Sequence, residues 1–309
     1  MKILLATDGS KLSNEAVNEV ATRPFPPNTK VRIVSAYERT PLITRLEPMG
    51  LMAETYAQAD HYALKAAQDA SEDAAKVLLD GNPALTVTVI AIDGSAKSVI
   101  LDEAEAFGAD LVVVGSHGYG MVERFMLGSV SHAVALHAKC SVEIVRGAKS
   151  GDKGWKILLA IDGSEQSEMA VEELASQPFP AGSEVKIISV IEPPYFQTSY
   201  PPGVVDVELY VEMEKNERER ALRSVEEAAD KLRAGEQSGN LVTTKVLSGS
   251  PKREILEEAD DFGADLIVVG SHGHGMFERF LLGSVSMAVA LHAKCSVEIV
   301  RSPKLGQKR

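Results

Sequence analysis

The chain of 309 residues has little cysteine, few aromatic side chains and no excess of positive charge. Its two cysteines, Cys140 and Cys295, are too few for a disulfide framework, and no CxxC pair or histidine-rich tract indicates zinc. We expect each to be a small buried hydrophobic residue. The 32 Lys and Arg against 44 Asp and Glu give a net charge of −12. That sign is wrong for neutralising nucleic-acid phosphates or anionic lipid, so we expect neither nucleic acid nor membrane as a partner.

Long hydrophobic runs are missing as well. The start of the chain, 1–7, is apolar for only a few residues before Asp8, which is too short for the core of a signal peptide. No run elsewhere approaches the ~18–20 apolar residues of a membrane-spanning helix. These absences predict a cytoplasmic protein. Hydrophobic residues at 45% and charged residues at 25% are proportions typical of a folded protein.

The most informative feature is that the sequence repeats itself. Residues 2–10, KILLATDGS, return at 156–164 as KILLAIDGS, displaced by 154 positions. Farther along, 107–146 matches 262–301 at a displacement of 155, with 35 of 40 residues identical. A period of this length is far longer than a solenoid unit, so each copy is expected to be a whole domain.

The repeat sets the predicted domain boundaries. We place the first domain at 1–146 and the second at 155–309. The polar, glycine-bearing stretch 147–154 between them is typical of a linker.

Within each copy, short runs of Val, Ile and Leu alternate with helical patterns. The first copy predicts strands at 2–7, 31–37, 85–92, 110–115 and 141–146. It predicts helices near 13–22, 55–80, 97–107 and 129–138, the third of them capped by Ser95. The second copy predicts strands at 156–161, 185–191, 241–247, 265–270 and 296–301.

Continuous apolar runs of this kind are typical of strands that are buried on both faces of a parallel sheet. The alternation predicts an α/β fold: two tandem, doubly wound, Rossmann-like domains, each with a five-stranded parallel sheet. In such sheets ligands bind outside the carboxyl ends of the strands, where the strand order reverses.

A glycine pattern after the fourth predicted strand is the strongest functional signal. The first copy reads Gly115-Ser116-His117-Gly118, then nine residues, then Gly128-Ser129-Val130-Ser131. The second copy reads Gly270-Ser271-His272-Gly273, then nine residues, then Gly283-Ser284-Val285-Ser286. A glycine loop that opens a helix offers unpaired N–H groups and a positive dipole end, which favour a phosphate. We expect the hydroxyls of Ser129 and Ser131 to donate to the same anion.

A carboxylate follows the first predicted strand of each copy. The turn reads Thr7-Asp8-Gly9-Ser10 in the first copy and Ile161-Asp162-Gly163-Ser164 in the second. The aspartate is expected at the same edge of the sheet as the glycine loop. The sequence leaves three roles open: capping the first helix, accepting ribose hydroxyls, or holding a water of a Mg²⁺ shell.

Together, the Asp-Gly-Ser turn and the G-x2-G-x9-G-S pattern resemble the universal stress protein family in its tandem form. The resemblance covers nearly the whole chain and is weakest at 38–92 and 192–247. It implies the adenine nucleotide alpha hydrolase-like variety of the fold. Members with the complete glycine signature bind ATP, so the resemblance implies an ATP-binding stress-response protein with ATP in each copy. Mg²⁺ is expected to arrive with the ATP phosphates, and its protein ligands are left open.

The resemblance extends to individual positions. It implies that the ends of the second strands, at Ala36 and Val190, contact adenine through the backbone. The implied contacts in the first copy are Thr7, Asp8, Ala36, Gly115, Ser116, His117, Gly118, Gly128, Ser129, Val130 and Ser131. Those in the second copy are Ile161, Asp162, Val190, Gly270, Ser271, His272, Gly273, Gly283, Ser284, Val285 and Ser286. Arg124 and Arg279, within the nine-residue inserts, are further candidates for phosphate contact.

The last strand departs from the family pattern. Members often carry a CPVLVV-like segment there, whereas this chain reads CSVEIV at 140–145 and again at 295–300. In the family this strand commonly pairs two domains edge to edge. We expect the two copies to form a pseudo-dimer within the chain through these strands, and a homodimer of chains is also compatible with the sequence.

Three functions are compatible with these features. The first is a nucleotide-sensing regulatory protein whose conformation or oligomer state is recognised by an unidentified protein partner. The second is an enzyme such as a slow ATPase, although TDGS is not the SGGxDS loop of ATP pyrophosphatases and no P-loop lysine follows the glycines. The third is an interaction scaffold with empty sites. Because His117 and His272 have no nucleophile-and-base partners in the sequence, we predict no enzyme, or at most weak ATPase activity.

Overall fold

A computed structural model describes most of the chain. It describes residues 1–39, 53–118, 127–147, 154–193, 207–235, 239–273 and 282–301. The chain divides into two compact units, Met1–Ala148 and Lys149–Ser302.

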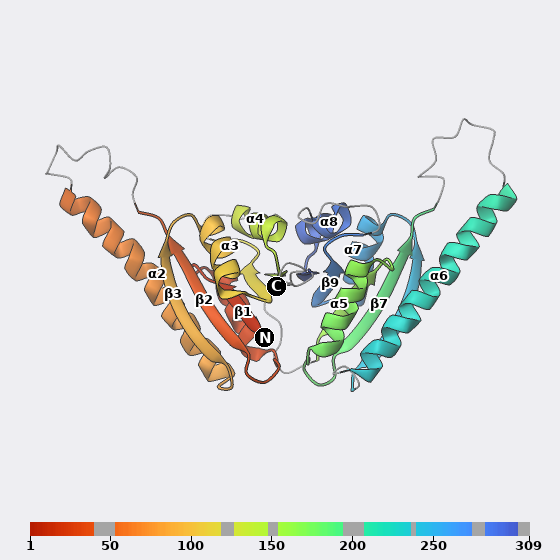
Figure 1. The fold of residues 1–309 in the computed structure, drawn as a ribbon, viewed down its shortest axis with the longest axis horizontal. Coiled ribbons are helices and arrows are strands. Elements are labelled where there is room, and N and C mark those ends of the chain that lie inside the picture. Colours follow the sequence, from red (N-terminus) through yellow and green to blue (C-terminus); the bar gives the residue numbers. More distant parts are fainter. Residues whose placement is uncertain are drawn as a thin grey trace, which may run out of the picture. The chain divides into compact units, whose positions relative to one another are not determined.

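The first unit is a doubly wound α/β domain. Its elements are β1 (Lys2–Ala6), α1 (Lys11–Thr22), β2 (Lys30–Tyr37), α2 (Ala53–Gly81), β3 (Thr86–Asp93), α3 (Ala96–Phe107), β4 (Leu111–Gly115), α4 (Ser129–His137) and β5 (Ser141–Val145). The strands lie in the order β3-β2-β1-β4-β5 and every neighbouring pair is parallel. Helix α1 packs against α2 and α3 against α4, and the two pairs cover opposite faces of the sheet (Figure 1).

The second unit repeats this architecture. Its elements are β6 (Lys156–Ile161), α5 (Glu165–Ser176), β7 (Glu184–Ile191), α6 (Val207–Ala234), β8 (Leu241–Ser248), α7 (Pro251–Phe262), β9 (Leu266–Gly270), α8 (Ser284–His292) and β10 (Ser296–Val300). The strands lie in the order β8-β7-β6-β9-β10, again all parallel. The predicted fold class is therefore confirmed in both copies.

Burial explains why the strands could be predicted so closely. Every residue of β4 and β5 is buried, as is every residue of β1 after Lys2. In the first unit, Ile3, Leu5, Val17 and Leu78 join one core cluster that connects β1 to α1 and α2. Each such side chain stabilises the fold by about 1.5–3 kcal/mol relative to an exposed one.

The structure shows how two helices of the first unit are capped. Ser10, not Asp8, caps α1: its Oγ accepts a hydrogen bond from the backbone N–H of Ser13 at 3.3 Å. Ser95 occupies the N-cap position of α3, but its side chain makes no capping bond. The expected cap by the Ser95 hydroxyl is therefore wrong.

The last strand buries its charge. Glu143 of β5 is 2% exposed and accepts a hydrogen bond at 3.0 Å from Arg23, which follows α1 and is 1% exposed. In the second copy Glu298 is equally buried. The glutamate that departs from the family pattern is thus an internal group of the fold in each unit.

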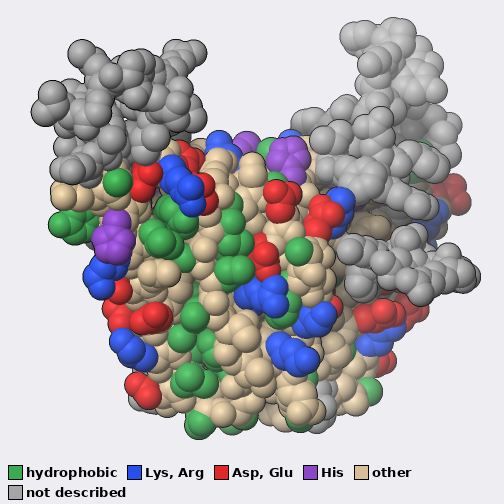
Figure 2. Space-filling model, turned by 60° about the vertical axis from the view of Figure 1, so that its left-hand side comes forward, with side chains coloured by type: hydrophobic (Ala, Val, Ile, Leu, Met, Phe, Trp, Pro, Cys, Tyr) green, Lys and Arg blue, Asp and Glu red, His purple; other side chains and the backbone are tan. Residues whose placement is uncertain are grey.

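The surface carries charges of both signs. On the face of the first unit in Figure 2, acidic and basic side chains are interspersed, with hydrophobic side chains between them. Within the described part of the chain, no helix is long and apolar enough to cross a membrane.

Candidate functional site

The strand order places the predicted loops together. In the first unit the order reverses between β1 and β4, and the corresponding strands of the second unit are β6 and β9. The carboxyl ends of these strands carry the Asp-Gly-Ser turn and the first glycine of the G-x2-G-x9-G-S pattern. The two sequence signals therefore meet at the position where doubly wound sheets bind ligands.

The aspartate turn is held by its own hydrogen bonds. One carboxylate oxygen of Asp8, Oδ1, accepts from the backbone N–H of Ser10 at 2.9 Å, and Gly9 takes a φ of 76°, which suits glycine. Asp162 repeats this turn and also accepts from the Ser164 hydroxyl at 2.6 Å. The carboxylate is thereby oriented before any ligand is present.

The second oxygen of the aspartate faces the glycine loop. A Cβ atom added at Gly118 would overlap Oδ2 of Asp8, and one added at Gly273 would overlap Oδ2 of Asp162. Neither glycine has a positive φ. A methyl group at this glycine would therefore displace the carboxylate of the aspartate, whereas the backbone conformation itself does not demand glycine.

The first glycine of the loop serves packing instead. A Cβ atom at Gly115 would lie 2.7 Å from the backbone oxygen of Leu12, and one at Gly270 would lie 2.9 Å from that of Gln166. Only glycine lets the strand end approach the first helix this closely.

The third glycine begins the last helix of each unit. Gly128 is the N-cap of α4 and makes no side-chain cap, and Gly283 does the same for α8. No described residue accepts a hydrogen bond from the backbone N–H groups of Ser129, Val130 or Ser131. These groups and the positive end of the helix dipole can bind an anion at this point.

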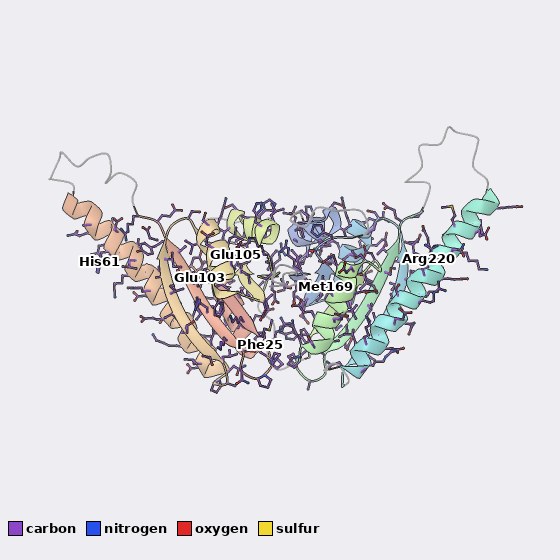
Figure 3. All side chains as sticks on the ribbon, in the orientation of Figure 1. Phe25, His61, Glu103, Glu105, Met169 and Arg220 are labelled. Carbon is purple, nitrogen blue, oxygen red and sulfur yellow. The ribbon has the colours of Figure 1, made fainter. Side chains whose placement is uncertain are left out.

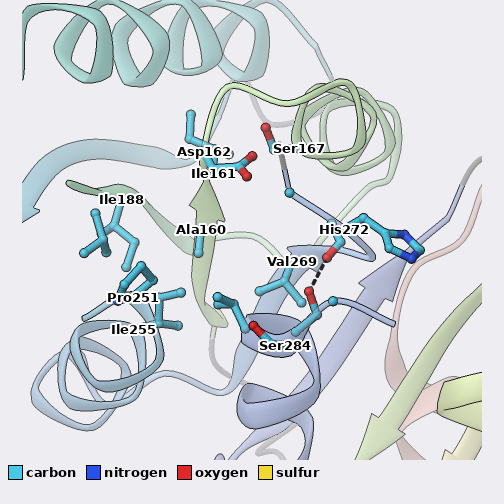
Figure 4. Close-up of a pocket in the computed structure, with 16 residues that line it drawn as sticks. Ala160, Ile161, Asp162, Ser167, Ile188, Pro251, Ile255, Val269, His272 and Ser284 are labelled. Carbon is cyan, nitrogen blue, oxygen red and sulfur yellow. Dashed lines mark hydrogen bonds between the residues drawn. The ribbon is translucent and has the colours of Figure 1, made fainter. Parts of the chain in front are cut away.

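One expected serine role is wrong. The hydroxyl of Ser131 donates to the backbone oxygen of Gly115 at 2.6 Å and is buried. In the second copy Ser286 donates to Gly270 at 2.6 Å, the dashed bond in Figure 4. These hydroxyls connect the last helix to the strand end, so of Ser131 and Ser286 only the backbone N–H groups are left to donate to an anion.

The second copy contains a cavity at this point, drawn in Figure 4. Its volume is about 270 Å³. Asp162, the glycine loop and the start of α8 provide the polar part of its wall. Ile188, Pro251 and Ile255 group on another side and make it apolar (Figure 4). A flat apolar group and an attached anion would match the two parts of this wall.

The first copy has a smaller cavity of about 100 Å³ with a less apolar lining. Four positions differ in size between the copies. The first copy carries Thr7, Val34, Ala36 and Ala96 where the second carries Ile161, Ile188, Val190 and Pro251. Thr7 also bonds within its own turn: its Oγ1 accepts from the N–H of Gly9 at 3.2 Å.

The structure brings most of the sequence-predicted residues to these cavities. In the first copy they are Thr7, Asp8, Ala36, Gly115, His117, Gly118, Val130 and Ser131. In the second they are Ile161, Asp162, Val190, Gly270, His272, Gly273, Gly283, Ser284, Val285 and Ser286. Ser116, Gly128, Ser129 and Ser271 do not line them. Arg124 and Arg279 lie outside the described residues.

The two loop histidines are internal groups. The imidazole Nδ1 of His117 lies 3.2 Å from the Ser116 hydroxyl, and His272 makes the same contact with Ser271 at 3.1 Å. Burial, and to a lesser degree the nearby charges of Arg146 and Arg301, lower the pKa of His117 and His272 respectively. The ring of His272 extends away from the apolar side of the cavity (Figure 4). Both histidines are therefore uncharged near neutral pH.

Sequence reasoning missed the apolar part of the wall. Val34 and Ile188 lie two residues before the predicted backbone contacts, and Ile100 and Ile255 come from the helix after the third strand. One signal was present: Gly-Ser precedes both α3 and α7, which marks a tight turn at the same edge of the sheet.

Fold and site together define a class: a tandem doubly wound α/β protein with a duplicated aspartate and glycine-loop site. The model of the universal stress protein family matches residues 1–146 and 155–301. The chain belongs to this family, which confirms the resemblance seen in the sequence.

Individual relatives agree with this assignment. A universal stress protein of Mycolicibacterium smegmatis is 32% identical over 240 residues, covering 76% of each chain. Universal stress protein YxiE of Bacillus subtilis is 34% identical over 148 residues, which is 47% of this chain and 98% of that one. The crystal structure of a universal stress protein from Archaeoglobus fulgidus has a TM-score of 0.59 at 19% identity and covers 97% of this chain and 98% of its own. That last likeness concerns the fold.

Proposed function

We propose that the protein binds ATP in both copies and acts as a regulatory protein of the stress response rather than as an enzyme. The observation that carries the proposal is the cradle in which the middle glycine of the loop faces the aspartate carboxylate beside the open start of the last helix. It is built twice with the same contacts, at Asp8 and Gly118 and at Asp162 and Gly273.

The chemistry of this cradle suits a nucleotide. The Oδ2 oxygen of the aspartate can accept ribose hydroxyls, and the helix N–H groups can hold phosphates. The apolar wall, including Ile188 and Ile255 in the second copy, suits a purine ring. Adenine is expected to be recognised by the backbone at Ala36 and Val190.

Magnesium would enter with the triphosphate. Among the described residues, no three His, Cys, Asp or Glu side chains gather as a metal site. Asp8 and Asp162 are the carboxylates that would hold a water of the Mg²⁺ shell, and the ion would neutralise phosphate charge. Chelation by EDTA is accordingly expected to weaken ATP binding.

A site of this kind can regulate by binding ATP without catalysing a reaction. Bound ATP would favour one conformation or oligomer state of the chain, and a protein partner would recognise that state. Turnover is expected to be slow or absent. A multiple-turnover rate above ~1 s⁻¹, within the usual range of enzymes, would contradict this part of the proposal.

The test is nucleotide stoichiometry in matched single variants. The nucleotide is extracted from the purified protein and identified, and ATP binding is then measured by calorimetry. Gly118→Ala and Gly273→Ala each place a methyl group against the aspartate of one copy, and neither position needs a positive φ. We expect two ATP molecules per wild-type chain and one in either variant.

Controls separate binding from folding. Circular dichroism and thermal unfolding should show that both variants are folded. Asp8→Asn and Asp162→Asn should each also lose one bound ATP per chain, although they add no volume to the side chain. A wild-type stoichiometry of one that neither glycine substitution changes would overturn the claim of two sites. No binding of ATP to the folded wild-type protein would overturn the proposed function.

A further inference from the structure

A second cavity adjoins the candidate site of the second copy. It has a volume of about 570 Å³ and lies among the carboxyl ends of β6 and β7 and the helix α6. Its lining residues and those of the cavity in Figure 4 have Asp162 and Val190 in common. The two cavities therefore lie on either side of the aspartate that we assign to the ribose.

Two arginines line this second cavity. Arg220 and Arg223 lie one turn apart on α6, and Arg220 is labelled in Figure 3. Neither guanidinium forms a hydrogen bond or ion pair with any described residue, although glutamates stand three or four positions away along the helix. Farther along α6, by contrast, Arg233 pairs with Asp230 at 3.1 Å. The two guanidinium groups at the cavity are thus available to a ligand.

The first copy lacks these arginines. Gly81 and Gly235 lie at the same point of the two units, against Ala21 of α1 and Ala175 of α5, and fix the alignment of α2 with α6 at a displacement of 154. At that displacement Arg220 corresponds to Ala66 and Arg223 to Asp69. Any role of the arginine pair therefore belongs to the second copy.

We propose that the second copy accepts adenine nucleotides that carry an additional phosphate on the 2′ or 3′ oxygen of the ribose. The inference rests on the proposed function, because it needs the ribose at Asp162. One ribose hydroxyl stays on the Asp162 carboxylate, and the phosphate on its neighbour passes Gly163 into the second cavity. There Arg220 and Arg223 bind it, since a guanidinium matches phosphate geometry with two parallel hydrogen bonds.

The acidic residues of the cavity restrict the ligand further. Glu192, Glu217 and Glu227 line it together with Asp162, so carboxylates outnumber the arginines. A free anion gains little in such a place, because the carboxylates repel it. A phosphate attached to an adenosine that is already held in the first cavity is brought to the arginines by those other contacts. The site therefore selects the phosphorylated nucleotide over inorganic phosphate.

The experiment compares three nucleotides on the second copy alone. In the Gly118→Ala protein, calorimetry measures adenosine 5′-monophosphate, adenosine 2′,5′-bisphosphate and adenosine 3′,5′-bisphosphate. We expect one bisphosphate isomer to bind at least about tenfold more tightly than the monophosphate, the effect of one charged hydrogen-bonded pair. Inorganic phosphate at the same concentration should not displace the monophosphate.

Matched variants test the arginines. Arg220→Ala combined with Arg223→Asp gives the second copy the residues of the first. This double variant should reduce the ratio of bisphosphate affinity to monophosphate affinity to about one. Arg218→Ala, on the same helix but outside the cavity lining, should keep the preference. In the Gly273→Ala protein, where the first copy alone binds, no preference is expected.

The outcomes distinguish this inference from the proposed function on which it rests. Equal affinity for the monophosphate and both bisphosphates, or a preference that survives loss of both arginines, would overturn this inference alone. Binding of none of the three would overturn it together with the proposed function.

Discussion

At the scale of single residues, the aspartate and glycine of the cradle could be predicted, and the partners of several other polar residues could not. Asp8 and Gly118 stand out because turn and loop residues recur at fixed spacing in both copies. The hydroxyl of Ser131 was expected to face an anion, yet it bonds to Gly115, 16 residues earlier. Arg23 reaches Glu143 across 120 residues. Contacts of this kind depend on packing of distant segments, and no local pattern encodes them.

The two loop histidines give a pH dependence at this same scale. The folded protein lowers the pKa of His117 and His272, so the unfolded chain binds more protons as the pH falls below about 6.5. The free energy of unfolding should therefore decrease between pH 7 and pH 5.5. Denaturant unfolding of the wild type and of a His117→Gln, His272→Gln double variant tests this. A wild-type slope no steeper than that of the variant would contradict it.

At the scale of elements, the strands could be predicted because buried parallel strands are continuous apolar runs. Each strand, and each helix of the first copy, lies within two residues of its predicted bounds. The ion pairs that connect these elements were not predicted. In the second copy Glu258 of α7 accepts hydrogen bonds from Lys186 of β7, at 2.8 Å, and from Lys245 of β8. The corresponding Glu103 of α3 pairs with Arg32 of β2, and Ile90 stands where Lys245 does.

Removing the charge of this glutamate should lower the free energy of unfolding more in the second copy than in the first. Burial acts to raise the pKa of Glu258, but the bonds from Lys186 and Lys245 outweigh it and hold that pKa below its usual range. Its contribution to stability is therefore present near neutral pH and lost as the pH falls through the lowered pKa. Glu258→Gln should reduce the free energy of unfolding by about 1–3 kcal/mol. Glu103→Gln is the matched control with one partner, and an equal or larger loss in that variant would refute the comparison.

At the scale of the whole molecule, the two units have the same fold, but different residues line their candidate binding cavities. The positions that differ around the two cavities lie outside 38–92 and 192–247, the segments in which the copies diverge most. The structure assigns the difference to Thr7, Val34, Ala36 and Ala96 against Ile161, Ile188, Val190 and Pro251. Larger apolar groups around the cavity of the second copy can cover more of a purine ring.

Unequal ATP affinities follow from that difference. If a bound purine covers two of the additional carbon atoms, at about 0.8 kcal/mol each, the gain is about 1.6 kcal/mol, or more than tenfold in affinity. The Gly118→Ala protein should thus bind ATP at least about tenfold more tightly than the Gly273→Ala protein. Val190→Ala together with Pro251→Ala should remove most of the gap. Equal dissociation constants in the two glycine variants would refute the argument.

The serine bond between the last helix and the strand end has a consequence for the entropy of binding. Because Ser131 and Ser286 hold the first turn of α4 and α8 against Gly115 and Gly270, the N–H groups that we propose to bind phosphate are ordered when the chain folds. A ligand that binds there loses its own freedom but need not immobilise the first turn of the helix, which leaves more of the contact energy as affinity. Amide hydrogen exchange at His132 and Met287, whose N–H groups donate to the backbone oxygens of Gly128 and Gly283, should accordingly be slow even without nucleotide. Substitution of Ser131 or Ser286 by alanine should speed exchange at this position of its own helix while the other helix stays protected.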